Sequence, residues 1–186
     1  MPGTDESSPA PPAPAVYLIT GIQASGKSTV AQALAERLPR SAHVRGDVYR
    51  RFVVNGREDM SPDPTSEAVE QLRLRHRLAA RTADAYADAG FTAVVQDVVL
   101  GEMLPYLIGE IRTDPLYVVV LAPSREAVAR RESARTKKAY GTFTVADLDI
   151  GLRDNTPPLG LWLDTSDLTV SETVDEILVR ARPFGR

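Results

Sequence analysis

The chain of 186 residues has no cysteine, which excludes disulfide bonds and thiolate metal sites. Histidine is nearly as scarce, because His43 and His76 are the only two and lie 33 residues apart. Two separated imidazoles do not predict a zinc site. No run of 18 apolar residues occurs, so the sequence predicts no membrane-spanning helix and no membrane partner.

An excess of positive charge is also missing. Lys plus Arg total 22 against 25 for Asp plus Glu, which gives a net charge of −3. This balance disfavours a nucleic-acid partner held by bulk positive charge, although it leaves room for a local basic groove. Lysine occurs only as Lys27, Lys137 and Lys138, which makes these positions worth following.

The N-terminal segment lacks the basic and apolar regions of a secretory signal, so we expect a cytoplasmic protein. Residues 1–14 contain five of the 14 prolines and are expected to form a disordered tail. Residues 15–186 have the length and the apolar content of a single domain.

From residue 15 on, short apolar runs alternate with helical patterns. The expected strands are 15–20, 41–47, 91–97, 116–123 and 160–166. The expected helices are 27–38, 48–54, 65–89 capped by Thr65 or Ser66, 101–112, 124–138, one within 141–154 capped by Thr144, and 169–182 capped by Ser171. This alternation predicts a three-layer α/β fold with a mostly parallel sheet, whose ligands bind at the carboxyl ends of the strands.

The first strand–helix junction fits the phosphate-binding pattern G-x-x-x-x-G-K-[ST]. Its loop amides and the following helix N-terminus are expected to hold nucleotide phosphates. Lys27 reaches the outer phosphates and Ser28 supplies a Mg²⁺ ligand. The expected cofactor-binding residues are Gly21, Ile22, Gln23, Ala24, Ser25, Gly26, Lys27, Ser28 and Thr29.

Asp47 follows the second strand, 20 residues after Lys27. A carboxylate there could accept the proton of a substrate hydroxyl, hold that hydroxyl for in-line attack, bind Mg²⁺ indirectly, or only cap the next helix. Arg50 and Arg51 are candidate substrate-binding residues, and as neighbours in a helix they point about 100° apart, so only one of them can face a given pocket.

Asp97 ends the strand 91–97 and would be costly to bury unless it is used or paired. We expect it to bind Mg²⁺ through water or to contact the substrate, with Gln96 sharing the role. Further along, Arg131 and Arg135 share one helical face and are expected to close over the nucleotide phosphates. The alternative for this lid, residues about 124–143, is a solvated basic helix.

Residues about 48–89 are expected to cover the phosphate acceptor. In the long helix of this region, Leu72, Leu78 and Ala79 can face the sheet. Arg75 and His76 then belong to the other faces, with His76 expected at the surface or behind the site.

The stretches GIQASGKST, RGDVYRR, VVQDVVLG and RRESAR together resemble the P-loop kinases of the chloramphenicol phosphotransferase type. They are also similar to shikimate and gluconate kinases and to small ATP-dependent kinases of actinobacteria. The resemblance implies a five-stranded parallel sheet in the order 2-3-1-4-5 and transfer of phosphate from ATP, with Mg²⁺, to a small-molecule hydroxyl. It assigns the base to Asp47, the phosphate-binding lysine to Lys27, the metal-binding hydroxyl to Ser28 and the lid arginines to Arg131 and Arg135. Shikimate kinases carry a second acid two residues after the first, and this chain has Tyr49 there.

The sequence therefore predicts an ATP-dependent phosphotransferase that acts on a hydroxyl of a small molecule, such as an antibiotic or another metabolite. Two alternatives remain open. One is a nucleoside or nucleic-acid-end kinase, and the other is a nucleotide-binding protein with slow turnover.

Overall fold

A computed structural model of the protein describes residues 13–133 and 143–185. Its strands are β1 (Val16–Gly21), β2 (Ser41–Arg45), β3 (Thr92–Gln96), β4 (Leu116–Leu121) and β5 (Leu161–Leu163). Its helices are α1 (Lys27–Arg37), α2 (Gly46–Phe52), α3 (Ser66–Asp88), α4 (Met103–Glu110), α5 (Arg125–Ser133), α6 (Val145–Arg153) and α7 (Val170–Arg180). None of these helices combines the length and the hydropathy needed to cross a membrane.

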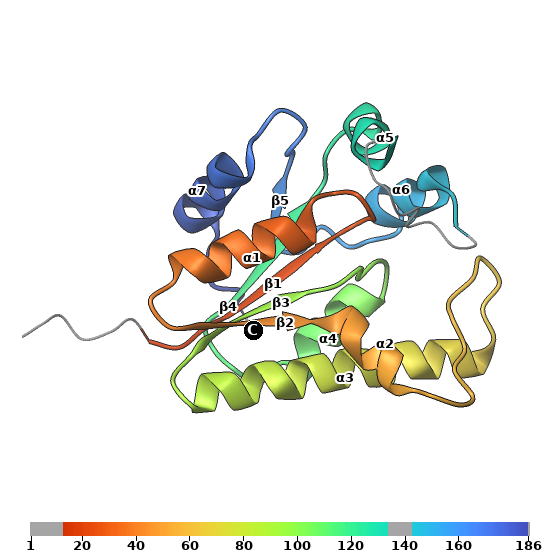
Figure 1. Ribbon diagram of the computed structural model, residues 1–186, viewed down its shortest axis with the longest axis horizontal. Coiled ribbons are helices and arrows are strands. Elements are labelled where there is room, and N and C mark those ends of the chain that lie inside the picture. Colours follow the sequence, from red (N-terminus) through yellow and green to blue (C-terminus); the bar gives the residue numbers. More distant parts are fainter. Residues whose placement is uncertain (1–12, 134–142, 186) are drawn as a thin grey trace, which may run out of the picture.

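The five strands form one parallel sheet in the order β2-β3-β1-β4-β5, which confirms the order implied by the resemblance to small kinases (Figure 1). Leu18 of β1 lies between Val95 of β3 and Val118 of β4. Because all strands run the same way, their carboxyl ends share one edge, where ligands of such sheets bind.

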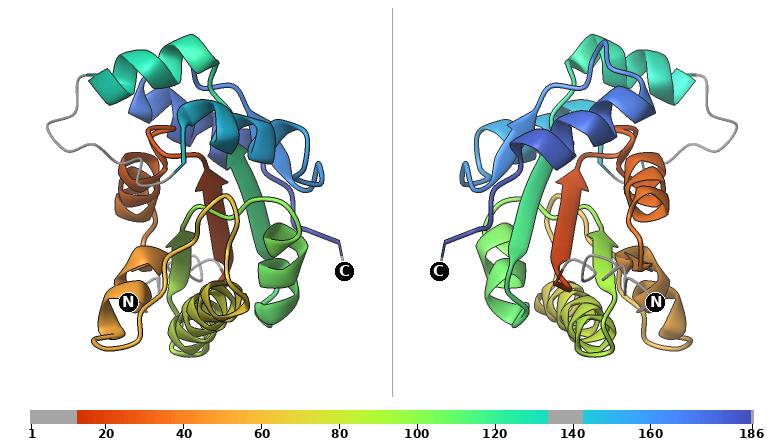
Figure 2. Two further views of the ribbon diagram at one scale, coloured as in Figure 1. Left: turned by 90° about the vertical axis from the view of Figure 1, so that its right-hand side faces the viewer. Right: turned by 90° about the vertical axis from the view of Figure 1, so that its left-hand side faces the viewer.

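Helices cover both faces of the sheet (Figures 1 and 2). On one face, Leu34 of α1 and Ile177 of α7 pack with Ile19 and Leu121. On the other face, the buried side chains of α3, α4 and α6 pack with β-strand residues such as Leu18. Burial on both faces explains why the inner strands read as continuous apolar runs rather than as alternating ones.

One helix cap differs from the sequence expectation. The hydroxyl of Thr169, not Ser171, caps α7, and it forms a capping box with Glu172 because that pairing satisfies two backbone donors at once. The expected caps Thr65 and Thr144 are confirmed. The expected tail up to residue 12 lies outside the described residues, as do Arg135 and the other residues from 134 to 138 of the expected helix 124–138.

Candidate functional site

The loop between β1 and α1 is shaped to surround an anion. Gly21 has φ of +150°, and a Cβ atom there would lie 2.6 Å from the carbonyl oxygen of Leu121, so only glycine fits. Gly26, with φ of +94°, precedes α1 and offers no capping side chain. The first amide groups of α1 therefore remain open to a ligand, together with the positive end of the helix dipole.

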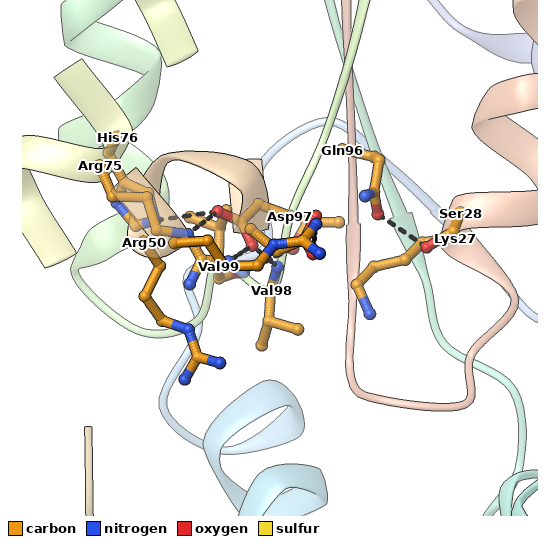
Figure 3. A network of polar contacts seen from close by, with 12 residues as sticks. Lys27, Ser28, Arg50, Arg75, His76, Gln96, Asp97, Val98 and Val99 are labelled. Atoms are coloured by element: carbon orange, nitrogen blue, oxygen red, sulfur yellow. Dashed lines mark hydrogen bonds and ion pairs between the residues drawn. The ribbon is translucent and has the colours of Figure 1, made fainter. Parts of the chain in front are cut away.

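The two polar side chains that begin α1 lie at this loop (Figure 3). The Lys27 ammonium donates a hydrogen bond to the Ile22 carbonyl at 3.2 Å, within the loop. The Ser28 hydroxyl donates to the side-chain oxygen of Gln96 at 3.1 Å. Gln96 is the last residue of β3 and pairs in register with Ile19, two residues before the loop begins.

Gln96 is expected from the sequence only as a companion of Asp97, whereas the structure places its amide oxygen against the hydroxyl expected to bind Mg²⁺. The signal in the sequence is its position at the end of a strand that neighbours β1. Among residues 13–133 and 143–185, no group of three His, Asp or Glu side chains could hold a metal ion. The oxygens of Ser28 and Gln96 nevertheless suit Mg²⁺, which often takes few protein ligands beside substrate phosphates and water.

Asp47 lies in the first turn of α2 and lines the same cavity as Lys27 and Ser28. Its carboxylate accepts a hydrogen bond from Arg51 at 3.1 Å, and about half of its side chain is exposed. The residue before the helix is Arg45, and no side chain caps α2. The interpretation of Asp47 as nothing more than a helix cap therefore finds no support in the geometry.

Asp97 is buried in an ion pair (Figure 3). Its side chain is 3 % exposed, and both carboxylate oxygens accept hydrogen bonds from the Arg75 guanidinium, one of them at 2.6 Å. The Val98 amide donates a further bond at 2.7 Å. Gly46 passes so close that a Cβ atom there would lie 2.1 Å from the carboxylate. The assignment of Arg75 to an outer face of α3 is therefore wrong, since its side chain is only 16 % exposed.

His76 is fully buried behind this ion pair, so a place at the surface is wrong for it. Neither ring nitrogen has a hydrogen-bond partner among the described residues, and Nε2 lies 3.9 Å from Asp97 Oδ2. Burial, and then the positive charge of Arg75, lower the pKa of His76 to about 3. The imidazole is therefore neutral at neutral pH.

Arg131 of α5 bridges two loops at the carboxyl edge of the sheet. Its guanidinium donates to the carbonyl of Ser25 at 3.2 Å and to that of Thr165 at 2.5 Å. It is thus anchored beside the phosphate loop rather than solvated. Nearby, the buried carboxylate of Asp149 in α6 accepts hydrogen bonds from Arg125 and Arg153, at 2.5 and 2.9 Å, and thereby joins α5 to α6.

One large cavity of about 1150 Å³ extends from the phosphate loop. Lys27, Ser28 and Gln96 line one part of it. The rest is enclosed by α2, residues 58–61, α3, the segment after β3 and the region of α6. Arg50 lines this cavity and is paired with Asp59 at 2.8 Å. Its neighbour Arg51 is not among the lining residues and is paired with Asp47 instead.

The sheet order, the glycine-bounded loop and the adjoining cavity define a P-loop domain of the kinase-like type. The chain belongs to the AAA_33 family, an AAA domain family whose model matches residues 16–150. No curated protein sequence matches the chain.

Solved structures share the fold at low sequence identity. The APS kinase of Mycobacterium tuberculosis in complex with AMPPNP and APS has a TM-score of 0.66 and 21 % identity, over 90 % of this chain and 97 % of that one. A sugar kinase from a Janibacter species has a TM-score of 0.62 and 19 % identity, over 90 % and 93 %. The tunicamycin resistance protein of Deinococcus radiodurans has a TM-score of 0.60 and 16 % identity, over 94 % and 100 %.

Proposed function

We propose that the protein is an ATP-dependent phosphotransferase that moves the γ-phosphate of ATP to a hydroxyl of a small molecule. The observation that carries this proposal is the cavity that joins Lys27, Ser28 and Asp47 and then continues beneath α2 and α3. A motor or a switch needs the phosphate loop, but it does not need a second chamber beside it. The kinase folds of the structural neighbours support the same reading.

Each residue has a defined role in this reaction. The loop amides and Lys27 hold the phosphates, and Arg131, anchored at the loop, neutralises their charge from the other side. When bound, Mg²⁺ would neutralise charge on the phosphate oxygens, with Ser28 as its protein ligand and Gln96 orienting that hydroxyl. Asp97, held by Arg75, instead fixes the wall of the acceptor chamber.

In the transfer step the acceptor oxygen forms a bond to the γ-phosphorus, and the bond from that phosphorus to the bridging oxygen of ADP breaks. The hydroxyl proton passes to the carboxylate of Asp47, which is partly exposed and paired only with Arg51 among the described residues. ADP and the phosphorylated acceptor are the products.

A nucleoside or a nucleic-acid end is the second candidate for the acceptor. Tyr49 and Phe52 form an edge-to-face pair in the same cavity, with ring centroids 6.0 Å apart, and could stack on a base. A kinase assay with labelled ATP and a panel of sugars, antibiotics and nucleosides separates the two candidates by the class that accepts phosphate.

Variants of the two central residues test the mechanism. Asp47→Asn should lower kcat by about 10²- to 10⁴-fold while ATP still binds, because only the proton acceptor is lost. Glu176→Gln is the matched control, since it breaks a similar exposed pair, with Arg180, on the distant helix α7. Lys27→Ala should weaken ATP binding itself. Unchanged transfer by Asp47→Asn would refute the assignment of Asp47 as the proton acceptor. ATP binding without transfer to any acceptor would favour a nucleotide-binding protein with slow turnover.

A further inference from the structure

The acceptor chamber has its own charge pattern, which bears on what it can hold. Its two arginines are both engaged by carboxylates: Arg50 by Asp59 at 2.8 Å, and Arg75 by Asp97 through two hydrogen bonds. A carboxylate partner partly neutralises the charge of an arginine and therefore weakens its attraction for a second anion.

The remaining cations of the cavity wall lie at the phosphate end. Lys27 sits in the phosphate loop, where its ammonium contacts the Ile22 carbonyl. Arg45 ends β2 and also lines a small hollow over α1 together with Ser28, Gln32 and Glu36. Both cations therefore lie beside the phosphate loop, and we assign them to the phosphates rather than to the far part of the acceptor.

The acidic side chains of the chamber are engaged as well. Asp47 accepts a hydrogen bond from Arg51. Glu58 and Asp147, which also line the cavity, accept hydrogen bonds from the uncharged groups of Thr65 and Thr144. Among the described lining residues, the acceptor half therefore offers no unpaired cation and carries an excess of negative charge. An anionic molecule there would be desolvated without a partner and would also face the negative charge of ATP.

Apolar side chains, by contrast, are abundant on the same wall. Tyr49, Phe52, Met60, Leu74 and Leu78 line the chamber from α2, residues 58–61 and α3. Phe52 is 68 % exposed and Leu74 is 41 % exposed, which is unusual for large apolar residues that face a hollow. Covering them with an apolar ligand surface would be favourable.

We infer that the acceptor is an alcohol that carries no negative charge and has a substantial apolar part, rather than a phosphorylated or carboxylated metabolite. This inference rests on the proposed function, because the chamber takes an acceptor only if phosphate is transferred. The paired arginines and the neighbouring carboxylates disfavour an anionic acceptor, and the exposed apolar wall supplies the affinity.

Matched pairs of probes test the charge of the acceptor. The pairs are an aryl glucoside with the corresponding aryl glucuronide, adenosine with AMP, and methyl shikimate with shikimate. Transfer from γ-labelled ATP is measured for each, and kcat/KM should favour the neutral member of any pair that reacts by about tenfold or more. A preference for the anionic member would overturn the inference and leave the phosphotransferase activity standing.

Failure of the reaction itself is distinguishable. If ATP binds and no probe is phosphorylated, the proposed function fails, and equilibrium dialysis of the same pairs with the ATP-bound protein decides the class of ligand. Retention of the neutral members supports the inference. Retention of the anionic members, or of neither, overturns it.

Two variants with matched controls test the wall. Leu74→Asn should raise KM for a reactive neutral probe about fivefold with kcat unchanged, because apolar contact is lost. Leu178→Asn, on the distant helix α7 and similarly exposed at 39 %, should not raise KM.

Asp59→Asn releases Arg50 from its ion pair. The ratio of kcat/KM for the neutral probe to kcat/KM for the anionic probe should therefore fall about threefold or more. Asp88→Asn breaks a comparable exposed pair with Arg112 and should leave that ratio unchanged. An unchanged KM in Leu74→Asn, or an unchanged ratio in Asp59→Asn, would contradict the inference.

Discussion

The buried imidazole of His76 makes the stability of the protein depend on pH in a way that can be worked out in advance. Burial and the charge of Arg75 lower its pKa from 6.5 to about 3 in the folded state. As pH falls below 6.5, the unfolded chain binds a proton at this site and the folded protein does not. The free energy of unfolding must therefore decrease as pH falls through this window.

The size of the effect follows from the two pKa values. Each pH unit below the unfolded pKa costs about 1.4 kcal/mol, so the loss from pH 7.5 to pH 5 is about 2 kcal/mol from His76 alone. The carboxylate of Asp97, 3.9 Å away, would favour a proton on the ring, but Arg75 already neutralises it through two hydrogen bonds. Ordinary carboxylates titrate mostly below pH 5, so the change in the free energy of unfolding between pH 7.5 and pH 5 comes mainly from histidine.

Urea denaturation at pH 7.5, 6.5, 5.5 and 5.0 measures this loss in the wild type and in His76→Leu. The leucine variant should lose most of this slope, because the group left to take a proton preferentially in the unfolded chain is His43, whose pKa is lowered by partial burial. The control is His43→Gln, at a half-buried ring that hydrogen-bonds Gln32. It should keep most of the slope. A flat wild-type profile, or an equal slope in His76→Leu, would refute the reasoning.

Three further predictions concern packing and the phosphate loop. Gly46→Ala should destabilise the protein by about 2 kcal/mol in thermal or urea unfolding, because the new Cβ would collide with the buried carboxylate of Asp97. Gly109→Ala is the control: it lies in α4 with open space around it and should stabilise the protein by about 0.5–1 kcal/mol. Asp149→Asn should cost about 2 kcal/mol at pH 7, a value discounted because both arginine partners are partly exposed. Burial raises the pKa of Asp149, but hydrogen bonds from the two arginines outweigh this and lower it, so the difference from wild type should shrink as pH falls below about 4. Arg131→Lys should weaken ATP binding about tenfold in a titration, since one ammonium cannot span both carbonyls that the guanidinium bridges, while Arg130→Lys, an exposed neighbour, should bind ATP normally.

The fold and the phosphate loop could be predicted because their signals are local. A buried parallel strand shows as an apolar run, and the loop needs glycine at fixed positions such as Gly21, where no side chain fits. The sheet order came from resemblance to known kinases, since no local pattern specifies which strands are neighbours.

The inner wall of the site could not be predicted, because it depends on which way a helix is rotated. In the 23-residue helix α3, periodicity places several residues between the core face and the solvent face, and Arg75 and His76 are among them. Arg75 points toward the sheet because its guanidinium pairs with the carboxylate of Asp97, which follows β3. Arg75 and Asp97 are 22 residues apart in the chain, so no local sequence pattern indicates that they pair.

The end of β3 explains how one short segment serves both parts of the site. Successive side chains of a strand point to opposite faces of the sheet. Gln96 follows the side of Val94, which packs toward α1, and therefore meets Ser28 at the phosphate loop. Asp97 follows the side of Val95, which packs toward α3, and therefore meets Arg75 at the acceptor chamber. Because Gly46 also packs against Asp97, this carboxylate ties β3 to both helices that cover the chamber, so a disturbance of Asp97 should alter the binding of acceptor before that of ATP.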